Sequence, residues 1–165
     1  MNRQEFLARR DYLNMVHGVT VRAIGAFGDD ELGFRPRPEM RTPRELIFHV
    51  YSQERLLAEA AQSGRMTMEA ANGSSPEDAA ASSDLTALVK VDDLRAFAER
   101  CHQTAETIAR ALSEEDLNRP VESPMGTFPA WQYFSFAYDE LWHHRGQLYT
   151  YLRLLGKEPP MLYDY

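Results

Sequence analysis

Two side chains near the C-terminal end of the sequence have the types and spacing suited to binding a metal ion. Glu140 and His144 lie four residues apart in YDELWHHRGQLYTYLRLLG, a segment with the apolar periodicity of one amphipathic helix. This spacing stacks both side chains on one helix face, and here that face is the apolar stripe. A buried, unpaired carboxylate is strongly unfavourable. A divalent cation would compensate it, because one ion accepts the carboxylate charge and the imidazole lone pair together.

His49, at the edge of an earlier apolar stripe, is the third candidate ligand. Two histidines and one carboxylate leave a coordination position free for water or substrate, which is the arrangement of catalytic metal sites. The spacing of Glu140 and His144 also fits a surface ion pair, or a hydrogen-bonded core pair without a metal. The sequence therefore predicts a shared site for His49, Glu140 and His144 and leaves these alternatives open.

Four further residues are weaker candidates for supporting this site or lining its pocket. Gln53 lies four residues after His49 on the same helix face, which places its amide to hydrogen-bond a ligand or a substrate, although a plain, partly buried amide is the simpler interpretation. His143 points about 100° away from His144, which favours packing at an interface or support of a ligand over coordination. His17 and Tyr151 are pocket candidates for which ordinary core or surface positions are the simpler interpretation.

Amphipathic helices must position these side chains. Apolar residues recur at three- and four-residue spacing over four ranges, which are Arg3 to Phe27, Pro43 to Ser63, Val91 to Leu112 and Pro129 to Leu155. Thr42 suits a helix cap, Pro43 the first helical position and Glu45 the end of a capping box. No stretch alternates convincingly with the period of a strand, and ESPMGTFP has the composition of a turn-rich lead into the last helix. The sequence predicts an all-α fold, a four-helix bundle in one domain over residues 1–165.

The connection between the second and third helices, from Ser63 to Lys90, has no sustained apolar face. The short runs ANGSS and SSD interrupt every candidate stripe. A connection of this length is unusual in a compact domain unless it contains structure of its own or acts as a lid. We therefore expect this long loop to be partly helical or mobile.

Composition excludes several classes of function. The chain of 165 residues has 25 acidic and 18 basic side chains, a formal net charge of −7, which repels polyanions and disfavours nucleic-acid binding. The single cysteine, Cys101, rules out an internal disulfide. No apolar run approaches the length of a membrane span, and the first residues do not resemble a secretory signal. A cytoplasmic protein without a membrane partner is the expectation.

Two segments give the sequence a resemblance to a known family. TPRELIFHVYSQE, preceded by LGFRPRPEMRT, and the later HHRGQLYTYLRLLGKEPPMLYDY resemble the DinB-like superfamily, which includes the bacterial DinB/YfiT proteins. The resemblance covers nearly the whole chain and implies a four-helix bundle with a divalent metal ion. It also implies one histidine ligand from the second helix and two, four residues apart, from the last helix. Carried over to this sequence, the ligands are His49 and His144, with Glu140 where the family pattern has histidine.

The carboxylate at position 140 changes what the site is expected to bind. Zinc, nickel, manganese and iron all accept a glutamate ligand, but a harder, anionic ligand shifts the preference towards manganese or iron. A bound water would be less acidified than in a site with three histidines. Glu140 is therefore either a working ligand or the mark of a degenerate site that binds metal poorly.

The resemblance implies a function without fixing it. Activities in the superfamily include thiol-dependent transfer with low-molecular-weight bacterial thiols and the mycothiol-dependent isomerisation of maleylpyruvate. This chain is then expected to be a metal-dependent enzyme of the thiol S-transferase or hydrolase type, acting on a small molecule. The alternative is a non-catalytic bundle, metal-stabilised or metal-free, with a stress-associated role. The aromatic-rich surface of the last helix predicts a homodimer.

Overall fold

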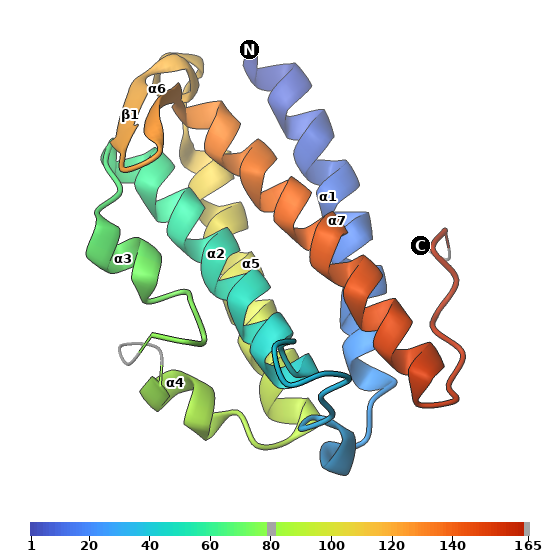
Figure 1. Cartoon of the computed structure of the whole chain (residues 1–165). Coiled ribbons are helices and arrows are strands. Elements are labelled where there is room, and N and C mark those ends of the chain that lie inside the picture. Colours follow the sequence, from blue (N-terminus) through green and yellow to red (C-terminus); the bar gives the residue numbers. More distant parts are fainter. Residues whose placement is uncertain (79–81, 164–165) are drawn as a thin grey trace.

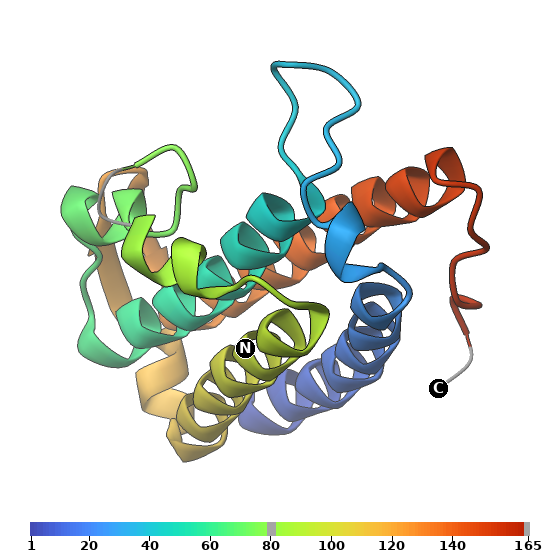
Figure 2. The ribbon, with the colours of Figure 1, turned by 90° about the horizontal axis from the view of Figure 1, so that it is seen from below.

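The long helices of the chain form an antiparallel bundle. The computed structural model describes residues 1–78 and 82–163. Within these ranges the four longest helices are α1 (Arg3–Gly25), α2 (Pro43–Ser63), α5 (Val91–Ala111) and α7 (Ala130–Leu154). Helix α2 packs against both α7 and α5, and α1 packs on the other side of this pair (Figures 1 and 2). The predicted all-α four-helix bundle is confirmed.

Helix α2 shows why its ends could be predicted from local sequence. The Thr42 hydroxyl accepts a hydrogen bond from the Glu45 backbone N–H at 3.2 Å, and the Glu45 carboxylate accepts one from the Thr42 N–H at 2.7 Å. This capping box satisfies two N–H groups that the helix leaves free. At the other end Gly64 adopts φ 83°, a left-handed conformation that favours glycine. Among the other long helices, the predicted starts of α1 and α5 agree with the structure, and the remaining ends differ by one or two residues.

The segment before α7 contains regular structure where the sequence indicated only a turn-rich lead. It contains the short helix α6 (Glu114–Asn118) and an antiparallel hairpin of β1 (Pro120–Ser123) and β2 (Gly126–Pro129). Each strand has only four residues, too few for an alternating pattern to stand out in the sequence. Gly126, with φ 125°, begins the second strand after the turn. Figure 1 shows the hairpin above the C-terminal end of α2.

The connection between α2 and α5 is partly helical, as the sequence predicts. It contains α3 (Met68–Asn72) and α4 (Ser82–Ala87), which lie beside α2 in Figure 1. Between them Ser74 is buried, with 3% of its surface exposed. The chain therefore returns to the bundle after α3. A further short helix, η1 (Asp29–Glu31), lies in the connection between α1 and α2.

The apolar core consists of two clusters along the bundle axis. One contains Phe6, Leu57 and Phe134, and the other contains Leu13 and Leu141. Buried polar residues of α1, α2 and α5 come between them in chain order, namely Arg10, Glu54 and His102. None of the helices in the described part of the chain is long and apolar enough to cross a membrane.

Candidate metal centre

The structure brings the three predicted ligands together between α2 and α7. His49 comes from α2, and Glu140 and His144 come from α7. The Glu140 Oε2 atom lies 3.1 Å from His144 Nε2 and 3.6 Å from His49 Nε2. One donor atom from each residue lies within 4.8 Å of the other two. The sequence pattern therefore predicted the convergence of these side chains correctly, and metal binding itself stays a prediction.

These separations fit donor atoms that share one ion. Bonds of about 2.1 Å in tetrahedral geometry place two donor atoms about 3.4 Å apart. The measured 3.1 Å and 3.6 Å lie on either side of that value. The two imidazole rings are nearly perpendicular, at 86°, with centroids 5.1 Å apart, so both can direct a nitrogen towards a common point. The residues present therefore fit a divalent cation.

Each histidine is oriented by a hydrogen bond through its other ring nitrogen. His49 Nδ1 lies 2.8 Å from the carbonyl oxygen of Ser74, and His144 Nδ1 lies 2.7 Å from Oε1 of Gln147. Because each Nδ1 faces an oxygen acceptor, Nε2 is the nitrogen directed at the Glu140 carboxylate, and a bound cation would take the place of the proton there. Outer hydrogen bonds of this kind orient histidine ligands and fix their tautomer.

Glu140 is less buried than its place on the apolar stripe indicates. Its side chain is 41% exposed, whereas those of His49 and His144 are 13% and 9% exposed. Hydrogen bonds from His144 and His49 hold the pKa of Glu140 well below its usual range, against the effect of partial burial. The carboxylate on the apolar stripe is therefore only partly buried, and the site opens to solvent on its carboxylate side.

The four weaker candidates divide into two near the site and two elsewhere. Gln53 donates from Nε2 to Ser74 Oγ at 2.7 Å, which holds the returning loop beside His49. His143 is exposed and packs edge-on against the His144 ring. His17 instead packs against Tyr51 and His102 in the core, and Tyr151 donates to the Arg41 carbonyl oxygen.

Ser74 and Gln147 are the supporting residues that the sequence did not reveal. Gln147 lies three residues after His144, so helical spacing alone could have indicated it. Ser74 had no such signal, because its carbonyl reaches His49 only through the path of the loop after α3. The side chain of Ser74 also donates to the Ala71 carbonyl oxygen at 2.7 Å, which fixes it to the end of that helix.

A second cluster of ionisable side chains, also missed from the sequence, lies inside the bundle. His102 Nδ1 is 2.9 Å from Glu54 Oε1, and Arg10 donates from Nε to Glu106 Oε1 at 2.6 Å. The His102 and His17 rings stack with centroids 3.7 Å apart. The available signal was a set of polar residues at apolar stripe positions of α1, α2 and α5.

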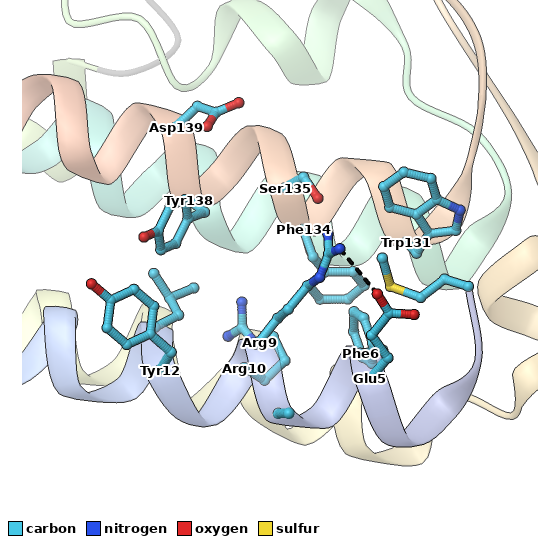
Figure 3. Close-up of a pocket in the computed structure, with 13 residues that line it drawn as sticks. Glu5, Phe6, Arg9, Arg10, Tyr12, Trp131, Phe134, Ser135, Tyr138 and Asp139 are labelled. Atoms are coloured by element: carbon cyan, nitrogen blue, oxygen red, sulfur yellow. Dashed lines mark hydrogen bonds and ion pairs between the residues drawn. The ribbon is translucent and has the colours of Figure 1, made fainter.

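A groove with aromatic walls separates α1 from α7. It has a volume of about 550 Å³ and is lined by Phe6, Tyr12, Trp131 and Tyr138 among others. Figure 3 shows the Tyr12 and Tyr138 rings facing each other across it. Their centroids are 6.1 Å apart. This groove lies on the aromatic face that led to the homodimer expectation, which stays a prediction.

Comparison with protein families identifies the class of protein that has this fold and site. A sequence model of the DinB superfamily matches residues 12–148. The chain therefore belongs to the DinB superfamily, in agreement with the resemblance of its two motifs. No curated protein matches it significantly.

Solved structures with the same fold include two of different character. A DinB-like protein of Bacillus subtilis, YjoA, matches with a TM-score of 0.72 and 19% identity, over 93% of this chain and 95% of its own. A mycothiol-dependent maleylpyruvate isomerase matches with a TM-score of 0.68 and 21% identity, over 90% of this chain. The match covers only 63% of the isomerase, so that enzyme is considerably longer.

Proposed function

We propose that this protein binds a divalent metal ion through His49, Glu140 and His144 and uses it in a thiol-dependent transfer reaction. The observation that supports metal binding most directly is the geometry of the imidazoles. Both Nδ1 atoms lie against carbonyl oxygens, and both Nε2 atoms converge on one carboxylate oxygen. A cation is the simplest partner for two lone pairs and a negative charge that meet at one point.

The metal, when bound, would supply Lewis acidity that favours the thiolate form of a substrate thiol. The protein side chains have separate tasks in this proposal. His49 and His144 would hold the ion through Nε2, and the contacts of their Nδ1 atoms with Ser74 and Gln147 orient the two rings. Glu140 contributes the negative charge, and its exposed side provides the direction from which a substrate reaches the site.

The thiol is proposed from the relatives and not from the site alone. The similar isomerase is mycothiol-dependent, and 90% of the present chain shares the fold of that enzyme. In the proposed reaction a thiolate sulfur attacks an electrophilic carbon, a carbon–sulfur bond forms and the leaving group departs. With 1-chloro-2,4-dinitrobenzene as electrophile, the products would be a thioether, chloride and the thiol proton.

Metal content and thiol transfer should be measured on protein purified without chelators. We expect one divalent ion per chain by elemental analysis, and conjugation of 1-chloro-2,4-dinitrobenzene with bacillithiol, mycothiol or glutathione. His144→Ala should lose both properties. His143→Ala is the matched control, since it removes the neighbouring, exposed imidazole and should keep both. Transfer that persists after removal of the metal would refute the metal-dependent reaction.

The same experiment tests a non-catalytic role. The candidate ligands come from α2 and α7, so a bound ion would join two helices and stabilise the bundle. Metal that raises the melting temperature by several degrees, without turnover with any of the three thiols, would favour this second function. Absence of stoichiometric binding by zinc, nickel, manganese and iron would overturn both.

A further inference from the structure

We infer that the cavity beside Glu140 receives the apolar, uncharged body of the substrate, an inference that rests on the function proposed above. The cavity has a volume of about 610 Å³, within the usual range for small-molecule sites. Glu140 and Gln53 form its edge towards the candidate metal centre. A molecule in this cavity would therefore have one end beside the Glu140 carboxylate, the candidate ligand that lines it.

Apolar side chains from separate segments, mainly methionine and phenylalanine, form most of the wall of the cavity. They are Leu57, Met66, Met68, Met125, Phe128 and Phe136. Methionine side chains are flexible and polarizable, and they adapt to apolar ligands of different shapes. Three methionines and two phenylalanines around one cavity favour an aromatic or alkyl group as the occupant.

The wall is built by hydrogen bonds and does not depend on apolar contact alone. The chain leaving α2 pairs with β1: Met66 N–H donates to the Glu122 carbonyl oxygen at 2.8 Å, and Glu122 N–H donates to the Gly64 carbonyl oxygen at 3.1 Å. This pairing fixes Met66 beside the hairpin that carries Met125 and Phe128. The hairpin thus has a task in the site, which is to form one side of the cavity.

Two of the methionines are unusually exposed for apolar side chains. Met68 is 58% exposed and Met125 is 62% exposed, and both lie at the same cavity. Exposed apolar side chains that gather at a concave site are typical of ligand-binding surfaces. A bound apolar group would cover both methionines and remove their apolar surface from water.

The charged residues of the lining limit the occupant further. Asp139 and Glu140 are its acidic members, and the described lining residues include no lysine or arginine. Figure 3 shows the Asp139 carboxylate pointing away from α1. A carboxylate or phosphate on the body of the substrate would face this negative charge without a compensating cation. The structure therefore favours a neutral substrate body over an anionic one.

The first test uses hydroxamic acids, whose head groups bind metal ions, on the zinc-loaded protein. Acetohydroxamate, hexanohydroxamate and adipic monohydroxamate should be compared by calorimetry. Affinity should rise about fourfold for each methylene group that enters the cavity, so hexanohydroxamate should bind much more tightly than acetohydroxamate. Adipic monohydroxamate, with a terminal carboxylate, should lose most of this gain. Equal affinity for all three would overturn the inference.

Two substitutions at the exposed rim test the location. Met68→Glu and Met125→Glu should reduce the gain of hexanohydroxamate over acetohydroxamate at least severalfold. Both variants should leave zinc content and acetohydroxamate affinity unchanged. Met161→Glu, at a methionine that is 70% exposed and outside this cavity, is the matched control and should keep the gain. Equal behaviour of all three variants would contradict the assignment.

A second measurement on the metal-free protein separates this inference from the proposed function. The chain has seven methionines, and their ¹³C-labelled methyl groups can be followed by NMR during titration with uncharged 4-phenylbutanol. Shifts concentrated at Met66, Met68 and Met125 would support the cavity even if no metal bound. Zinc binding without such shifts, and without dependence on tail length, would overturn the cavity while leaving the metal centre intact.

Discussion

Two clusters of histidine and glutamate lie on different sides of α2, and they satisfy their charges in different ways. His49 faces Glu140 and His144 of α7, whereas Glu54 faces His102 of α5. The two α2 residues are five positions apart, which places them about 140° apart around the helix. Both clusters contain histidine and glutamate, and their surroundings decide what each can do.

The inner cluster contains its own permanent cation. The Arg10 guanidinium lies 3.4 Å from Glu54 Oε1 and within hydrogen-bond distance of Glu106, and it is almost fully buried. Burial alone would raise the pKa of Glu54, but the hydrogen bond from His102 and the charges of His102 and Arg10 lower it overall. The ion-pair partners of Glu140 within the described residues are the two histidines.

Hydrogen bonds of His102 show how completely its ring is engaged. Its Nδ1 faces Glu54 and its Nε2 faces Asn14 Oδ1 at 2.8 Å. The Asn14 amide nitrogen donates to Glu106, so its oxygen is the atom that faces His102. Both ring nitrogens of His102 therefore face oxygen acceptors, as those of His144 do. The feature that separates the inner cluster is the buried Arg10 guanidinium, which already supplies a cation to its carboxylates.

The largest contrast is expected for metal binding. His49→Ala should weaken binding of zinc or manganese by a factor of 100 or more, on the order of 3 kcal/mol, because one of three donors is lost. Helical content should change little. His102→Ala is the matched control in the inner cluster and should keep stoichiometric binding. Metal content and calorimetry check both variants, and loss of binding in the control would contradict the division between the clusters.

Removing a carboxylate should have opposite consequences in the two clusters. Glu54→Gln leaves Arg10 and His102 buried near a neutral group, so unfolding free energy should fall by about 3 kcal/mol. Glu140→Gln should change the stability of the metal-free protein little or raise it, since that side chain is 41% exposed and has no buried guanidinium beside it. Urea unfolding with a chelator present measures both. Similar losses in the two variants would remove the distinction.

A more modest change is expected when Glu140 is replaced by histidine. Glu140→His restores the pattern of three histidines that the superfamily resemblance implies, and nitrogen donors favour zinc and nickel. Affinity for nickel or zinc should rise roughly tenfold, while preference for manganese should decline. Competition titrations with a chromogenic chelator provide the measurement. A weaker nickel affinity in the variant would show that the carboxylate suits the site better than a third imidazole.

The smallest expected effect concerns the dependence of stability on pH. Burial of His17, reinforced by the charge of His102, lowers the pKa of His17 below 6.5, and Glu54 and Glu99 only partly oppose this. The folded chain therefore binds fewer protons at His17 than the unfolded chain. This contribution to stability is complete above the unfolded pKa and is lost as pH falls below it.

His17→Phe should make stability fall less steeply with decreasing pH. The useful window runs from about pH 7 to about pH 5.5, around the ordinary histidine pKa. Urea unfolding of the metal-free protein at several pH values gives the slope for the variant and for the parent. An unchanged slope would show that His17 is not held neutral by its surroundings in the inner cluster.

The sequence by itself determined the features that depend on neighbouring residues. Helical periodicity gave the four long helices, and Thr42 with Glu45 fixed the start of α2. The four-residue spacing of Glu140 and His144 placed them on one face, because the geometry of a helix turn is local. It could not show how deeply Glu140 is buried, since its exposure depends on the elements that surround α7.

Tertiary structure decided which distant groups meet. The return of the chain after α3 brings the Ser74 carbonyl to His49, and no local pattern encodes that path. Packing of α1, α2 and α5 gives Glu54 and His102 the guanidinium of Arg10, which distinguishes the inner cluster from the candidate metal centre. The two short strands similarly gain their order from pairing with each other and with the chain after α2. The two groups of each such contact lie far apart in sequence, so no local pattern can indicate that they meet.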